Sequence, residues 1–531
     1  MKPFRLLTLA VFAAATLPRL AHRGMFVDGV TYASIARNLA QGRGSFWSPA
    51  YTATLYPQFH EHPPLGFWLQ SLWFRVFGDH LFVERLYALM VGLATAALIA
   101  AIYRQLHADT LPEASPLGVG NELPGPGPET RAQHRSGAGV GPSRSKMRRD
   151  EQRLASAGNQ RNRHGSPRQA ADLAWLPVLL WIAVPVVSWA MVGNMLETTV
   201  ALFTTAAVAA AVKAVLQSGS GARPPASAVA WSVLSGLGVV GASLTKGPVG
   251  LFPLAAPAML LLLPNGRRVW RLPLVQWTTV IVCALLLWEW GTARASLTEY
   301  FNQQVMAALA GEREVSRSSF TIVKALLQGV MLPMLAAGML AVAAAGRWVA
   351  PSHDARSRAV VFLLMGLAGT LPILVSTKQA GHYLVPAVPL FTLATALAVG
   401  PTAMAAAQRL GTQGWRTILN IATGLVVLGT VAGSLAPGLG RDRERLADLD
   451  ALAAAVPLGQ IVGLCPESNS DWGLHAWFER QFRVSLDAAD GARRDWFLET
   501  ERAKGACVPA ACTAATDPRR PLVLMKCRRA D

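Results

Sequence analysis

The chain alternates long apolar segments with short polar connections over most of its length. Eleven of these segments approach the roughly 20 residues that an α-helix needs to cross the hydrocarbon core of a bilayer. No convincing small-residue cleavage site follows the first segment, so we interpret it as a retained helix and not as a signal peptide. We predict a polytopic α-helical membrane protein with transmembrane helices at residues 4–21, 80–103, 173–191, 197–216, 228–244, 249–264, 272–290, 322–345, 359–376, 384–400 and 417–436.

The composition agrees with this pattern. Of the 531 residues, 52% are hydrophobic and only 15% are charged, whereas soluble chains carry about 25% charged residues. Every second connection is rich in lysine or arginine, which by the positive-inside rule places it in the cytoplasm. We therefore expect a bacterial cytoplasmic (inner) membrane protein with its N-terminus inside and its C-terminus outside. These basic connections contain Lys2, Arg5, Arg104, Lys213, Arg223, Arg267, Arg268, Arg271, Arg347, Arg356, Arg358, Arg409 and Arg416.

Residues 105–171 interrupt the alternation with a stretch rich in Pro, Gly, Ser and Arg. Such a stretch cannot bury enough apolar surface to offset its chain entropy. We predict a disordered basic cytoplasmic insert, which either touches anionic lipids of the inner leaflet or is simply a tolerated insertion. It separates residues 1–104, with the first two spans and an outer loop at 22–79, from the helices at 172–436.

The tail, residues 437–531, has the character of a small α/β extracytoplasmic domain. "GQIVGLCPES" and "PLVLMKC" are typical of strands, and "RERLADLDALAAAV" and "LHAWFERQF" of helices. The tail is rich in arginine, but long domains cross the membrane largely regardless of charge. Four of the five cysteines lie here, which favours disulfides in an oxidising compartment; three pairings stay open, and free thiols are the alternative. They are Cys465, Cys507, Cys512 and Cys527, whereas Cys283 lies within a span as a small apolar residue.

Polar side chains collect in the outward connections. Lys246 in "TKGP" and Lys378 in "STKQAGHY" place cations on the outer side, against the positive-inside rule. Ionisable groups at span ends are candidates for function and call for partners. The same face receives Asp28, His60, Glu61, His62, Glu197, His382 and Tyr383, together with the charge run Glu312, Arg313 and Glu314, which we interpret as solvated.

This face suits a phosphate held at membrane depth. Cations bind phosphate, and a nearby carboxylate can act as a general base. In "DGVTYASIARNLAQG", Tyr32, Ile35, Ala36 and Leu39 form one apolar helical face, which predicts a helix lying in the interface. The chain has no Walker-type glycine loop and no dinucleotide fingerprint, so a lipid-linked donor is favoured over a nucleotide.

Taken in order, these motifs resemble the integral-membrane glycosyltransferases of the GT-C class. Within that class they are most similar to the protein mannosyltransferase and aminoarabinose-transferase-type (ArnT-like) family. The resemblance covers most of residues 1–400, apart from the insert. It rests on "DGVTYASIARNLAQG", "HEHPPLGFWLQ", "GNMLETTVALF", "LTKGPVGL" and "TKQAGHYLVPAVP". His62 stands where aminoarabinose transferases usually carry lysine, and Glu197 where many members carry aspartate.

The resemblance implies an inverting transfer of a sugar from a polyprenyl-phosphate donor. The acceptor would be lipid A, another envelope glycan, a lipid or a protein, with the bilayer as surroundings and no nucleic acid as partner. Asp28 would be the catalytic base, and Glu61 and Glu197 would orient the acceptor or a cation. The donor phosphate would be held by His62, Lys246, Lys378, His382 and Tyr383. No cofactor is required, although "HEH" has side chains able to bind a divalent metal.

Each of these residues also has a structural interpretation. Asp28 could only cap its helix, Glu197 could only favour a helix dipole, and the lysines could snorkel from span ends. His60 could be a solvated loop residue, and His382 and Tyr383 could be interface anchors. A transporter is the main rival function, but it would place polar groups near the midplane and often shows internal repeats. A membrane scaffold with a partner-binding tail is a third.

The orientation gives the first testable prediction. Reporter fusions after residues 130, 225 and 350 should read as cytoplasmic, and fusions after 50, 310 and 480 as external, because basic connections stay inside. A cytoplasmic signal at 310 or 480 would contradict the assignment of all these polar groups to one outer face.

Overall fold

A computed structural model of the chain describes residues 2–108, 172–218, 224–263, 269–311, 320–376, 378–436 and 440–528. Most of the predicted insert lies outside these residues, and so does the charge run at 312–314. Helix α4 extends to Ala108, past the boundary predicted after residue 104, because Leu106 is still fully buried in the bundle.

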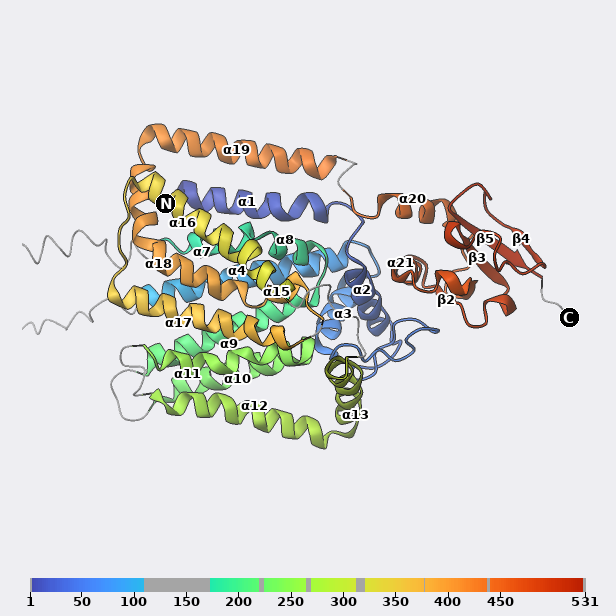
Figure 1. Cartoon of the computed structure of the whole chain (residues 1–531), viewed down its shortest axis with the longest axis horizontal. Coiled ribbons are helices and arrows are strands. Elements are labelled where there is room, and N and C mark those ends of the chain that lie inside the picture. Colours follow the sequence, from blue (N-terminus) through green and yellow to red (C-terminus); the bar gives the residue numbers. More distant parts are fainter. Residues whose placement is uncertain are drawn as a thin grey trace, which may run out of the picture.

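Long helices run side by side and form the body of the molecule (Figure 1). Short helices and the tail domain (residues 440–528) lie at one end of this bundle, which we call the tail side. The bundle consists of α1 (Lys2–Leu20), α4 (Val83–Ala108), α7 (Trp175–Ala183), α8 (Pro185–Val192), α9 (Leu196–Gln217), α10 (Ala226–Lys246), η1 (Gly247–Ala255), α11 (Ala256–Leu260), α12 (Arg271–Glu289), α15 (Thr321–Lys324), η4 (Ala325–Met331), α16 (Leu332–Ala345), α17 (His353–Thr370), α18 (Val388–Arg409) and α19 (Gln413–Leu435).

Among the described residues, nine helical runs are long and apolar enough to cross a membrane. The pair α7 and α8, bent by 75° where Pro185 opens α8, makes a tenth. One of the nine runs, Ala226–Leu260, contains a reversal at Gly247, because Gly250 packs back against the backbone of Ala242 and Ser243. The polytopic α-helical fold is confirmed, with nine or ten spans among the described residues where eleven were predicted, because the predicted spans 228–244 and 249–264 both correspond to the one run Ala226–Leu260.

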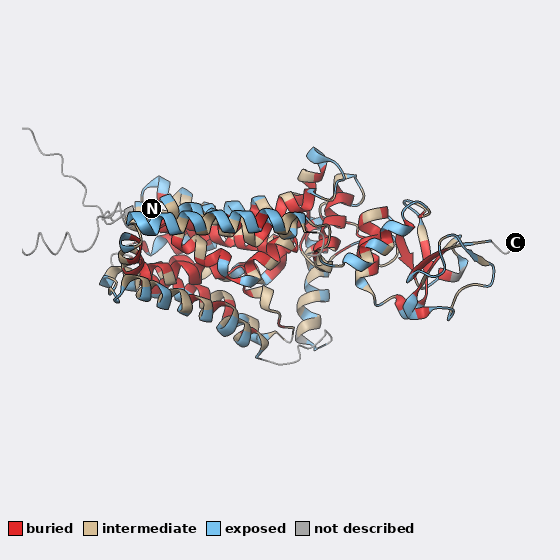
Figure 2. Cartoon of the chain, turned by 90° about the horizontal axis from the view of Figure 1, so that it is seen from above, coloured by how far each residue is buried: buried red, intermediate tan, exposed pale blue. Residues whose placement is uncertain are grey.

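Burial separates central from peripheral helices. Most residues of α9 and α18 are buried, whereas α12, α16 and α19 expose large apolar side chains such as Leu285, Leu340 and Leu428. Figure 2 shows this contrast between a buried interior and exposed outward faces. Exposed apolar faces of this kind suit contact with lipid, since lipid chains are as apolar as leucine.

Three shorter helices lie on the tail side: α2 (Val27–Ala40), α3 (Leu65–Phe77) and α13 (Gly291–Tyr300). The predicted apolar face of α2, with Tyr32, Ile35, Ala36 and Leu39, is buried. An interfacial helix would face lipid and headgroups, but α2 packs between α3 and a helix of the tail domain, and most of its polar residues are buried too. Both faces of α2 therefore contact protein.

The tail domain is a small α/β unit, as predicted. Its five-stranded sheet has the order β2-β1-β3-β5-β4, with β1 parallel to β2 and β3, and β5 antiparallel to β3 and β4. Disulfides join Cys465 to Cys507 and Cys512 to Cys527, which selects one of the three pairings. The elements are α20 (Arg443–Leu452), β1 (Ile461–Leu464), α21 (Trp472–Phe482), β2 (Ser485–Asp487), β3 (Trp496–Thr500), β4 (Cys512–Ala514) and β5 (Leu522–Cys527).

Candidate active site

The polar residues predicted to share one face come from helix ends on the tail side. Asp28 lies in the first turn of α2 and Glu197 in the first turn of α9. Lys246 is the last residue of α10. Lys378, His382 and Tyr383 lie in the connection between α17 and α18.

An ion pair between Lys246 and Glu197 forms the centre of the cluster. The Lys246 Nζ donates to Glu197 Oε1 at 2.6 Å, and the two side chains are 9% and 0% exposed. The other carboxylate oxygen, Oε2, is buried and has no hydrogen-bond partner among the described residues. Because a buried charge needs a counter-charge, Glu197 is committed first of all to Lys246.

Aromatic rings enclose this pair. The Lys246 Nζ lies 5.4 Å from the centre of the Tyr383 ring, within range of a cation–π contact. The ring of His382 packs against Trp189 at 5.5 Å, and its Nε2 lies 3.4 Å from Glu197 Oε1. Burial lowers the pKa of His382 below its usual 6.5, so the imidazole is neutral at pH 7. Of the two side chains that contact Glu197 Oε1, Lys246 is therefore the one that carries a positive charge.

Asp28 differs from Glu197 in having no counter-ion of its own. Its side chain is partly buried, and its carboxylate makes no hydrogen bond or ion pair with any other described residue. Burial raises its pKa above 3.8; the charge of Lys246 and, more weakly, that of Lys378 oppose this, while the charges of Glu197 and Glu61 add to it. A carboxylate with a raised pKa and no fixed partner is suited to accept a proton.

The alternative role of Asp28 as a helix cap is not supported. Phe26 occupies the N-cap position of α2, and no side chain there accepts a hydrogen bond from the first turn. Asp28 lies inside the first turn, where a carboxylate still interacts favourably with the helix dipole.

The three side chains of "HEH" point to different partners. Burial lowers the pKa of His60, which leaves it neutral at pH 7. In the described part of the chain, one group of three potential metal ligands has its donor atoms within 4.8 Å of one another, and it contains the disulfide-bonded Cys465 and Cys507. The contacts of "HEH" are His60 Nδ1 with Ser296 Oγ at 3.2 Å, Glu61 Oε1 from Tyr56 OH at 2.8 Å, and His62 Nε2 with Tyr32 OH at 3.1 Å.

The start of α2 is attached to the bundle by contacts that the sequence did not reveal. Asn194 Nδ2 donates to the carbonyl of Gly29 at 3.0 Å, and Gln70 Nε2 donates to Asn194 Oδ1 at 2.8 Å. A Cβ on Gly29 would overlap the carbonyl of Gly193, so only glycine permits this approach. The sequence offered one signal for these contacts, the lone Gln70 within the apolar run of α3. It is informative only once its partner, Asn194, is known.

Helix α13 covers the cluster from one side. A Cβ at Gly247, where φ is +71°, would overlap the phenol of Tyr300 at the end of α13. Trp290, just before α13, packs edge-on against Trp47 at 5.6 Å. Together with the contact between Ser296 and His60, these contacts hold α13 over the loop that carries "HEH".

Comparison with known proteins gives one clear result. No protein-family model matches this sequence, and no curated protein matches it. Among solved structures, apo ArnT from Cupriavidus metallidurans matches with a TM-score of 0.59 at 14% identity, over 97% of this chain and 95% of that chain. The chain has an ArnT-like fold.

ArnT from the same organism bound to undecaprenyl phosphate matches equally well, with a TM-score of 0.60 at 15% identity, over 98% of this chain and 97% of that chain. The ArnT-like fold thus includes the tail domain as well as the helices. The GT-C-like fold predicted from the motifs is confirmed.

The buried ion pair leads to a second prediction. Lys246→Met should destabilise the protein by about 3–5 kcal/mol, because Glu197 would stay buried without a counter-charge. The double variant Lys246→Met/Glu197→Leu should regain most of that loss. The measurement is denaturant unfolding of the purified protein in detergent, with Lys213→Met, which removes a lysine lying over the Trp231 ring, as the matched control. A Lys246→Met protein as stable as wild type would contradict the pairing.

Proposed function

We propose that this protein is an inverting glycosyltransferase that moves a sugar from a polyprenyl-phosphate donor to an acceptor in the cell envelope. The observation that carries the proposal is Asp28, a carboxylate with a raised pKa and no counter-ion of its own within the influence of two lysines. The ArnT-like fold supports it, because ArnT has been crystallised with undecaprenyl phosphate.

In the proposed reaction, a hydroxyl oxygen of the acceptor attacks the anomeric carbon of the donor sugar. The bond from that carbon to the phosphate oxygen breaks, and the electron pair leaves with the lipid phosphate. Asp28 accepts the hydroxyl proton. Phosphate is a good leaving group, so one base and charge stabilisation suffice, and one displacement inverts the anomeric centre.

The two lysines would stabilise the charge of the leaving phosphate to different extents. Lys378 is half-buried and makes no ion pair with any described residue, so its full charge is available. Lys246 is already paired with Glu197, which keeps it charged and fixes its position. We therefore assign Glu197 the role of holding Lys246, in place of the acceptor-orienting role expected from the resemblance. His382 and Tyr383 line the same cluster.

Around this cluster, Glu61 and His62 are held by tyrosines of the first loop. Tyr56 donates to Glu61, and Tyr32 contacts His62. We propose that Glu61 faces the acceptor and that His62 contacts the donor. The protein would act on the outer face of a bacterial inner membrane, on lipid A, another envelope glycan, a lipid or a protein.

The proposal predicts the behaviour of Asp28→Asn, which keeps the size of the side chain and removes its basicity. Transfer of radiolabel from polyprenyl-phosphate sugars in membranes should fall by a factor on the order of 10²–10⁴, the usual effect of general acid–base catalysis. Donor binding should persist, whereas Lys378→Ala should weaken donor binding as well as turnover. A well-inserted Asp28→Asn protein with near-normal transfer would exclude the catalytic assignment.

The pH profile provides a further prediction. Only deprotonated Asp28 can accept the proton, so transfer should rise with pH through an apparent pKa. Because burial raises the pKa of Asp28, this limb should lie above the ordinary value of 3.8. Rates measured from acid to neutral pH in wild type and in Asp28→Asn test this, since the limb should vanish in the variant. A limb at or below 3.8, or one that persists in the variant, would assign it to another group.

A further inference from the structure

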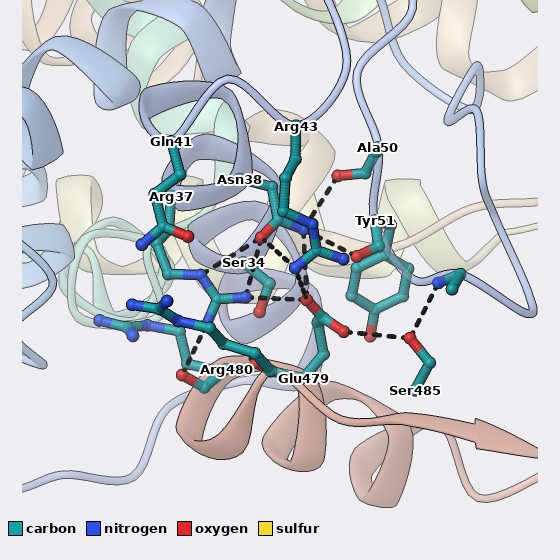
Figure 3. A network of polar contacts seen from close by, with 12 residues as sticks. Ser34, Arg37, Asn38, Gln41, Arg43, Ala50, Tyr51, Glu479, Arg480 and Ser485 are labelled. Atoms are coloured by element: carbon teal, nitrogen blue, oxygen red, sulfur yellow. Dashed lines mark hydrogen bonds and ion pairs between the residues drawn. The ribbon is translucent and has the colours of Figure 1, made fainter. Parts of the chain in front are cut away.

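The tail domain contacts α2 through a fully buried ion pair. Arg37 near the end of α2 and Glu479 of α21 lie 2.8 Å apart, from Nη2 to Oε1, and their side chains are 1% and 0% exposed. Figure 3 shows the two side chains meeting between the two helices. Burial lowers the pKa of Arg37 to about 10, with Glu479 opposing the shift. The contact therefore joins two charges that neither helix could bury alone.

Glu479 also accepts hydrogen bonds from two residues at and just after the end of α2. Its Oε1 lies 3.3 Å from Asn38 Nδ2 and 3.3 Å from Arg43 Nη1. Arg37 Nη1 in turn donates to the backbone carbonyls of Glu479 and Arg480, at 2.9 and 3.0 Å. The end of α2 is thus held by a network, and Glu479 is the one carboxylate in it.

Arg480, the next residue of α21, contacts a different part of the bundle. It donates to Asp79 Oδ1 at 2.8 Å and to Glu84 Oε2 at 3.0 Å, at the connection into α4. Arg483 adds a second contact to Asp79 at 2.9 Å. Glu479 therefore holds α21 against α2, and Arg480 holds it against the start of α4. The position of Glu479 is thus fixed by the contacts of its neighbour.

A buried ion pair of this kind does not by itself favour the folded state, because apolar residues of similar volume are often at least as stabilising. What it does supply is a defined geometry. Arg37 follows Asp28 by nine positions on one helix, or about 13.5 Å at 1.5 Å per residue. The other end of α2 is held by the bond from Asn194 to Gly29. A helix held at both ends keeps Asp28 in one place.

We propose that Glu479 is a positioning residue for the transfer reaction, holding α2 through Arg37 so that Asp28 stays aligned with the lysine cluster. This inference rests on the proposed function. Asp28 remains the catalytic residue, and the tail domain becomes part of the catalytic apparatus without contributing a group to the chemistry.

The test is a double-mutant cycle between Glu479 and Asp28. Glu479→Gln keeps the shape but removes the charge, and kcat at saturating donor should fall by about 10- to 100-fold, the usual effect of displacing a reacting group by about 1 Å. Inhibition by free polyprenyl phosphate should change much less than kcat, because the two lysines assigned to the phosphate are not on α2 and only His62 contacts that helix, through Tyr32. In the Asp28→Asn background, Glu479→Gln should change the residual rate by about twofold or less, because residues acting through one group are not additive.

Arg445→Gln is the matched control. Arg445 binds Asp471 at the start of the same helix, α21, but makes no polar contact with α2. It should leave kcat unchanged. If Glu479→Gln does not accumulate, Arg43→Gln takes its place, because Arg43 is 38% exposed and its loss leaves no buried charge behind. Its expected loss is about three- to tenfold, again only when Asp28 is present.

The outcomes separate this inference from the function on which it rests. A wild-type protein without any transfer from polyprenyl-phosphate sugars would refute the function itself. A wild type that transfers, with a Glu479→Gln protein that transfers equally well, would refute the positioning role. Equal losses with and without the Asp28→Asn substitution would refute it too, and so would a loss of affinity for polyprenyl phosphate as large as the loss of kcat, because either result would show general damage to the fold.

Discussion

A lysine that is removed from water at the end of a transmembrane helix must have a carboxylate beside it, and the tail side of this bundle depends on that constraint. Lys246 ends α10 and Glu197 begins α9, so their contact fixes two helices at the depth where the chain reverses. The pair also decides the state of its neighbours. With Glu197 committed to Lys246, Asp28 is the carboxylate that we propose accepts a proton, and Lys378 is the cation that we propose binds the donor phosphate.

The second buried pair solves a different problem. The first loop leaves the bundle, and its helix α2 is held by one contact at each end. Asn194 holds its start to the bundle, and Glu479 holds its end to the tail domain. In the proposed reaction, the bundle supplies the charges around the leaving phosphate, and the tail domain supplies the alignment of the base.

Much of this fold could be predicted from the sequence, because membrane spans are encoded locally. About 20 consecutive apolar residues identify a span without knowledge of its neighbours, and a lysine at a span end is conspicuous for the same reason. Pairing is not local. Glu197 and Lys246 are 49 residues apart, and Arg37 and Glu479 are 442 apart, so no periodicity connects them. The strands β2, β3 and β4 were not predicted; β2 and β4 have three residues each, and so short a segment carries no alternation.

Helix α2 shows where sequence reasoning fails in such a molecule. Its apolar face was identified correctly, but an interfacial helix would expose its polar face to water and headgroups, whereas Arg37 and Asn38 are buried under α21. A polar face that is covered by protein must be satisfied group by group. The covering helix therefore needs an acid at Glu479 and a base at Arg480, and no other order of the two charges would match α2 on one side and α4 on the other. These contacts connect α21, a helix of eleven residues in the tail domain, to the loop that carries the proposed base.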